Sequence, residues 1–155
     1  MGQIVRAFNR LEVNAANYVV GSSAWLPLLK NVPAANFREV TLAVRLHYIK
    51  AALVAGVQIN FGVFGSAPTE EDPTQEYLTG GGTTPLFMVS LTTTTAGNFP
   101  LLLTASNFTP PVATGNNPTA GYYFPVPGFI TVAQQVVIAS SAAGDVLLSG
   151  DVILK

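Results

Sequence analysis

The sequence predicts an all-β fold, an antiparallel β-sandwich or single jelly roll of about eight or nine strands with long loops. Apolar and polar residues alternate with period two in several segments, and these segments are rich in β-branched and aromatic residues. The 14 glycines and 11 prolines are spread between these segments, where they mark turns. At 155 residues and 49% hydrophobic composition, residues 1–155 are expected to fold as one domain with its own core.

Three segments alternate strictly, and each predicts a strand that is buried on one face. They cover residues 40–48, 57–64 and 146–154. Residues 35–53 also offer apolar positions at helical spacing, which makes a helix the alternative for that part of the chain. Their alternation and their content of Val, Thr, Tyr and Ile favour a strand.

The remaining strands are predicted from composition and from the turn residues beside them. They are residues 3–13, 17–20, 24–30, 86–95, 99–105 and 129–140. The N-terminal residues 1–13 are expected to form an arm or an edge strand. Residues 66–84, 107–120 and 122–128 are predicted to be long loops, and residues 141–145 a short hairpin turn.

Charge is scarce and unevenly placed along the chain. Only 10% of the residues are charged, where about 25% is usual. Residues 1–50 hold six basic and two acidic residues, a net charge of +4, and the remaining residues hold one basic and six acidic residues, a net charge of −5. Residues 77–144 form an uncharged stretch of 68 residues. Because uncharged polar groups are cheaper to desolvate than ions, a neighbouring protein can cover such a surface at little cost.

The residue inventory excludes several classes of chemistry and targeting. The chain contains no cysteine, which excludes disulfides, cysteine-ligated zinc and thiol catalysis. Residues 1–6 do not begin an apolar stretch of the kind that a secretory signal needs, so none is expected. No apolar run approaches the ~20 residues of a membrane-spanning helix, and we expect no membrane partner.

The single histidine, His47, is predicted to lie beside Arg45 on the polar face of its strand. A Ser-His-Asp site would need a serine within hydrogen-bond reach and an acid to orient the ring, and the sequence contains no nucleophile elbow. A histidine at the sheet surface or at an interface is therefore favoured. One histidine also excludes zinc sites that use several histidines.

Carboxylates supply no better catalytic signal. Four acids crowd into one predicted loop: Glu70, Glu71, Asp72 and Glu76. They could ligate calcium, but their spacing matches no EF-hand, and an exposed acidic loop is favoured. A glycosidase pair of Glu39 with Glu12 or Asp151 has nothing to support it. We therefore expect no enzyme, no cofactor, no metal and no small-molecule substrate.

Two groups of residues are candidates for contacts between subunits. The basic residues are too sparse for a nucleic-acid interface, and we hypothesise that Glu70, Glu71, Asp72 and Glu76 of one copy contact Arg6, Arg10 or Arg38 of another. The second group is Tyr122, Tyr123 and Phe124, which lie among glycine and proline residues in a predicted exposed loop. These aromatics would pack against another subunit or stack on a sugar. Trp25 is predicted to belong to the core.

An all-β chain with few catalytic residue types and long uncharged loops resembles coat and head-decoration (capsid cement) proteins of viruses and bacteriophages. The resemblance implies a jelly-roll or β-sandwich subunit that self-associates, often as a trimer, and joins other capsid subunits in the virion. It implies synthesis in the host cytoplasm and contacts made by residues 1–13 and by the three long loops. A carbohydrate-binding or lectin-like module on the same fold is the alternative.

Overall fold

The protein folds into β-strands joined by turns, and the described part of the chain contains no helix. The computed structural model describes residues 2–14, 24–53, 57–66, 85–92, 100–107, 113–114, 117–118, 126, 128–138 and 144–155. The strands are β1 (Gln3–Asn14), β2 (Leu26–Pro33), β3 (Val40–Ala51), β4 (Val57–Ser66), β5 (Phe87–Leu91), β6 (Leu101–Ser106), β7 (Ala113–Thr114), β8 (Asn117–Pro118), β9 (Phe129–Ile138) and β10 (Asp145–Leu154).

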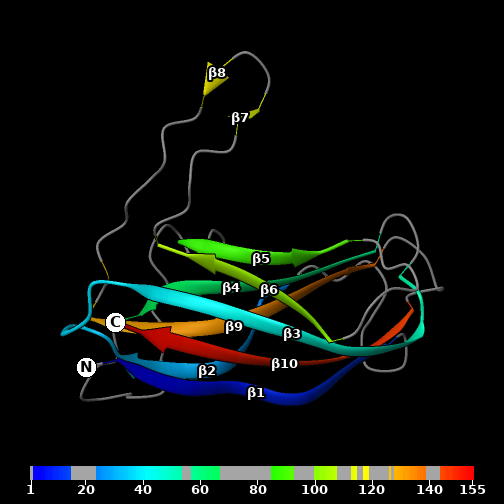
Figure 1. Cartoon of the computed structure of the whole chain (residues 1–155), viewed down its shortest axis with the longest axis horizontal. Coiled ribbons are helices and arrows are strands. Elements are labelled where there is room, and N and C mark those ends of the chain that lie inside the picture. Colours follow the sequence, from blue (N-terminus) through cyan, green and yellow to red (C-terminus); the bar gives the residue numbers. More distant parts are fainter. Residues whose placement is uncertain are drawn as a thin grey trace.

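Eight of these strands form two antiparallel four-stranded sheets that pack face to face (Figure 1). The first sheet has the order β1-β10-β3-β6, and the second has the order β2-β9-β4-β5. With β7 and β8 set aside, every connection except the one from β4 to β5 passes from one sheet to the other. This winding is that of a single jelly roll, which confirms the predicted fold class.

The crossing between β9 and β10 corrects one prediction. Residues 141–145 are predicted to form a hairpin turn, but the strands on either side of them do not pair with each other, because β9 belongs to the second sheet and β10 to the first. The apolar face of each strand must pack against the opposite sheet. The chain therefore crosses from one sheet to the other between β9 and β10, and their apolar faces lie on opposite sides of the core. Gly144 enters β10 at φ +80°, where a Cβ would lie 2.8 Å from the carbonyl oxygen of Ala52. Only glycine fits there without strain.

The core lies between the two sheets and follows the alternation in the sequence. Alternate residues of β3 from Val40 to Leu46 are at most 1% exposed, and so are Ile59, Phe61 and Val63 of β4. Phe8 from β1 stacks on Phe61 from β4 with ring centroids 4.7 Å apart, so this pair joins the sheets across the core. Gly150 of β10 lies directly beneath Phe8, because a Cβ there would come within 2.3 Å of the ring.

The other element predictions have mixed outcomes. The strand prediction for residues 40–48 is confirmed and the helical alternative is wrong, because β-branched residues at alternate positions fit a half-buried sheet better than a helix. The strands predicted at 86–95 and 99–105 are confirmed over β5 and β6, and residues 93–95 and 99 lie outside the described residues. The loop prediction for 107–120 is incomplete, since β7 and β8 pair there as a two-stranded sheet of their own (Figure 1). The strand predicted at residues 17–20 lies outside the described residues.

Candidate functional site

Charge is segregated between the two sheets. The strands of the first sheet carry Arg6, Arg10, Glu12, Arg45, His47, Lys50, Asp145 and Asp151. The second sheet carries only Lys30, in β2, and its strands β4, β5 and β9 have no charged residue and no histidine. Because the inner faces of both sheets form the apolar core, the polar side chains of the first sheet lie on its outer face. We call this outer surface of the first sheet the charged face.

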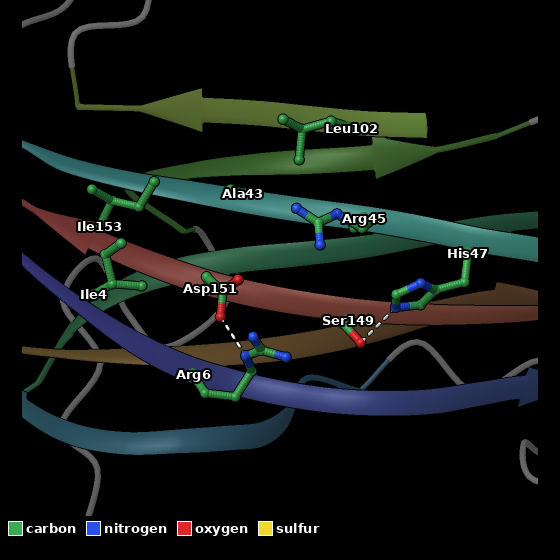
Figure 2. Close-up of a pocket in the computed structure, with 9 residues that line it drawn as sticks. All are labelled: Ile4, Arg6, Ala43, Arg45, His47, Leu102, Ser149, Asp151 and Ile153. Carbon is green, nitrogen blue, oxygen red and sulfur yellow. Dashed lines mark hydrogen bonds and ion pairs between the residues drawn. The ribbon is translucent and has the colours of Figure 1, made fainter. Parts of the chain in front are cut away.

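A groove on the charged face gathers residues that are far apart in the sequence. It has a volume of about 240 Å³ and is lined by Ile4, Arg6, Ala43, Arg45, His47, Leu102, Ser149, Asp151 and Ile153 (Figure 2). Strand register explains the grouping, since Ile4 pairs with Ile153, and Ser149 pairs with Arg45. The groove therefore runs across all four strands of the first sheet and has both apolar and cationic walls.

A buried hydroxyl at the centre of the groove connects three strands. Ser149 is 5% exposed, and its Oγ lies 2.8 Å from Nε2 of His47 (Figure 2). The backbone N–H of Arg10 donates a hydrogen bond to the same Oγ at 3.0 Å. The Ser149 hydroxyl donates in turn to Oδ1 of Asn9 at 3.3 Å. Arg10 has φ +51°, at a point where the register between β1 and β10 is irregular. The Ser149 hydroxyl therefore accepts the hydrogen bond of a backbone N–H that is not paired within the sheet.

These residues do not assemble a catalytic triad within the described part of the chain. Ser149 does lie within reach of His47, as nucleophilic catalysis would need. The nearby carboxylate of Asp151 instead forms an ion pair with Arg6, with Nε and Oδ1 2.5 Å apart. The Ser149 hydroxyl is buried and already bonded to the backbone. The arrangement therefore stabilises the strand irregularity rather than activating a nucleophile.

A second charged cluster lies on the same face, toward the other end of β1 and β3. Lys50 forms an ion pair with Glu12 and lies 3.8 Å from Asp145. The hydrogen bond from Lys50 and its positive charge lower the pKa of Glu12, and the hydrogen bond to Glu12 raises the pKa of Lys50. Both side chains are well exposed, so solvent screens the pair strongly. Across residues 2–14, 24–53 and the other described ranges, no three His, Asp or Glu residues are grouped to hold a metal ion.

The sequence-predicted interface arginines lie in different places. Arg6 is already paired with Asp151 and also donates to Asn9. Arg10 is exposed on β1, and Arg38 is exposed in the connection before β3, where its backbone N–H donates to the carbonyl of Lys155 at 2.7 Å. The structure therefore places Arg6 and Arg10 on one strand and Arg38 apart from them, beside the C-terminal residue.

The other predicted interface residues lie outside the described part of the chain. They are Glu70, Glu71, Asp72, Glu76, Tyr122, Tyr123 and Phe124. Sequence reasoning missed Arg45 as a groove residue. Arg45 is exposed and has no ion pair among the described residues. Strand alternation already placed it on the polar face, but only the register with Ser149 and Leu102 brings it into the groove.

Trp25 is half-buried, but it is not part of the core between the sheets. Its ring packs edge-on against Phe64, with centroids 5.0 Å apart. Phe64 alternates with the inward-facing Phe61 and Val63, so it lies on the outer side of the second sheet, where it is fully buried. Gly62 leaves room for this contact, since a Cβ there would lie 3.0 Å from the Trp25 ring. Trp25 therefore covers the outside of β4.

Comparisons with known proteins give structural matches only. No family model matches the chain, and no curated protein matches it. Solved structures that it is similar to include three from infectious bursal disease virus. The Gx strain structure has a TM-score of 0.48 at 12% identity, and the VP2 subviral particle has a TM-score of 0.48 at 13% identity. A mutant VP2 from derived T=1 particles has a TM-score of 0.44 at 12% identity.

The first two matches cover 99% of this chain and 32% of the viral chain, and the third covers 99% and 31%. The chain thus spans about a third of the length of these viral proteins. Separately, none of the described residues belongs to a helix that is long and apolar enough to cross a membrane.

Proposed function

We propose that this protein is a structural subunit of a virus or bacteriophage particle, a coat or decoration protein that self-associates and stabilises a shell. The observation that carries the proposal is the lack of charge in β4, β5 and β9 of a jelly roll in which every charged strand residue except Lys30 lies in the other sheet. The surface of a soluble monomer is usually about 25–35% charged, with both signs interspersed. The exposed residues of β5, Met88 and Ser90, are uncharged, and a surface of this kind is expected to contact neighbouring proteins.

The outer side of the second sheet supports this proposal with polar groups that are already satisfied. Asn60 is 4% exposed and accepts hydrogen bonds from Gln58 at 2.9 Å and from Ser90 at 2.8 Å. It donates to Gln135 at 2.9 Å. Amide and hydroxyl groups that bond one another need no water, so this side of the sheet is buried without charged groups and at a low desolvation cost.

Exposed apolar side chains add to the surface available for contacts. Met88 of β5 is 45% exposed and Leu26 of β2 is 48% exposed. On the first sheet, Ile4 is 70% exposed. Single exposed apolar residues are ordinary, but here they accompany a deficit of charge, and that combination favours association.

The charged residues would set the orientation of neighbouring copies. Arg10 and Arg38 are exposed and have no ion pair among the described residues, which leaves them available to an acidic segment. We propose that residues 70–76 of one copy contact these arginines in another, whereas Arg6 is already neutralised by Asp151. The trimer that the resemblance implies is part of the same proposal.

Sedimentation velocity over a hundredfold range of protein concentration tests the proposed function, together with negative-stain electron microscopy. We expect a stable oligomer or larger particles. A protein that stays monomeric throughout, at physiological salt, would overturn the proposal. Binding of a monomer to a glycan array, lost in Tyr122→Ala and Tyr123→Ala, would instead establish the carbohydrate-binding alternative.

A further inference from the structure

The four edge strands of the sandwich are protected very unequally against pairing with another chain. On one side of the molecule, β1 carries Arg6, Arg10 and Glu12, and its register with β10 is interrupted twice. Its neighbour β2 contains Lys30 and two prolines, and its register with β9 is also interrupted twice. Charges, prolines and bulges are the devices that stop an edge strand from accepting another strand.

The edge strand β6 on the opposite side has none of these devices. Its sequence, Leu-Leu-Leu-Thr-Ala-Ser, contains no charge, no proline and no glycine. Its register with β3 is unbroken from Leu101, opposite Leu46, to Ser106, opposite Thr41. Strand β5, which borders β6 in the other sheet, is equally free of charge and proline, and its register with β4 is also unbroken (Figure 1).

The side chains of β6 are also exposed where a partner strand would contact them. Leu101 is 42% exposed, Leu102 is 54% exposed, and Thr104 is exposed as well. β6 ends the first sheet, so the backbone groups on its far side face no further strand of that sheet. Unpaired backbone groups on a regular, apolar edge form a template for another β-strand.

We propose that β6 is an interface strand, and that β6 of a second copy adds to it in antiparallel orientation. The proposal rests on the proposed function, because it names one contact between two copies, separate from the contacts of the proposed trimer. Pairing across a two-fold axis covers both edges at once and opposes no like charges. It joins the two four-stranded first sheets into one continuous sheet.

The register between the two β6 strands follows from one requirement. The outer faces of the two first sheets must lie on the same side of the joined sheet. A two-fold axis through Leu103 pairs residues 101–105 with the same segment of the second copy. It places Leu102 of one copy beside Thr104 of the other on the outer face, and Leu101 beside Ala105 on the inner face. Because Leu102 also lines the groove, the second copy would extend the wall of that groove.

Charge placed on this edge tests the proposal. Thr104→Lys puts an ammonium group opposite Leu102 of the second copy, on an exposed position that tolerates lysine in the monomer. Sedimentation velocity should give a dissociation constant for the dimer that is at least about tenfold higher than that of the wild type. The matched control is Ala52→Lys, at an exposed position after β3 and beyond the segment that pairs with β6, and it should leave association unchanged. Circular dichroism verifies that both variants fold.

A second measurement keeps the test independent of a folding defect. The chain contains no cysteine, so a Leu102→Cys/Thr104→Cys double variant introduces its only thiols. Opposed residues of antiparallel strands have Cα atoms about 4.5–5.5 Å apart, within disulfide range, whereas residues i and i+2 of one strand lie about 7 Å apart. Mild oxidation should therefore give a covalent dimer, and Ala52→Cys should not.

The outcomes separate this proposal from the proposed function. If the wild type associates while Thr104→Lys associates equally well and the cysteine pair does not cross-link, the β6 interface is wrong and the proposed function stands. If the wild type is monomeric at every concentration, the proposed function itself is overturned.

Discussion

The contact between Gly150 and Phe8 allows a quantitative test of how the two sheets are joined. In Gly150→Ala, the new Cβ would lie 2.3 Å from Cε1 and 2.5 Å from Cζ of Phe8. The ring cannot move freely, because it is 8% exposed and stacks on Phe61 at 4.7 Å and 16°. The methyl group must therefore displace Phe8 from its stack.

The expected cost can be worked out from these contacts. Overpacking of a core costs about 1–3 kcal/mol, and loss of the aromatic pair costs about 0.5–1.5 kcal/mol. Alanine recovers about 0.5–1 kcal/mol relative to glycine in a strand. The net loss in the free energy of unfolding is about 2 kcal/mol, which corresponds to a decrease in Tm of about 4–8 °C for a domain of this size.

Urea denaturation of wild type, Gly150→Ala and the matched control Gly128→Ala measures this effect at one protein concentration. A Cβ at Gly128 has no atom within 4 Å, so that variant should be neutral within about 0.5 kcal/mol. Phe8→Leu combined with Gly150→Ala should show positive coupling, because the smaller side chain relieves the clash. The reasoning is refuted if Gly150→Ala is as stable as Gly128→Ala.

Three further predictions concern polar groups. Ser149→Ala should lower the free energy of unfolding by about 1–3 kcal/mol, since it leaves a backbone N–H and His47 without their shared partner; equal stability in urea titrations would contradict this. Asn107→Ala should cost about 1–3 kcal/mol, because the 2% exposed amide bonds two backbone groups beside β3, and thermal melts measure it. The pKa of Glu12 is lowered in the folded protein, so Glu12 contributes to the free energy of unfolding at pH values above its unfolded-state pKa. This contribution is lost as the pH falls through the folded-state pKa. Glu12→Gln, which removes the pair with the exposed Lys50, should flatten this small dependence in urea titrations from pH 6 to pH 2, and an unchanged pH profile would refute the assignment.

The strands of this protein were largely predictable because their signal is local. Alternate residues of a strand point to opposite faces, so the positions of Val40, Leu42, Val44 and Leu46 already place them on one buried face. The same alternation put Arg45 and His47 together on the polar face. The prediction at residues 141–145 was wrong because a short polar segment with glycine fits a hairpin turn and a crossing between sheets equally well.

The groove depended on information that no local pattern contains. Ser149 and His47 are 102 positions apart, and Arg6 and Asp151 lie on strands from opposite ends of the chain. Their contacts follow from the strand order β1-β10-β3-β6 and from the interruptions in the β1 register. Strand order results from packing over the whole chain, where many pairings share the same alternation.

By itself, the sequence determined that this chain forms β-strands, which residues each strand buries, and how scarce charge is over residues 77–144. Only the tertiary structure decided which strands are neighbours, that the charged residues of the strands gather on the first sheet, and that β6 is an uncharged edge. The reason is physical. Side-chain alternation is set by backbone geometry within one strand, whereas neighbours and edges are set by long-range pairing that must bury the apolar faces of all strands at once.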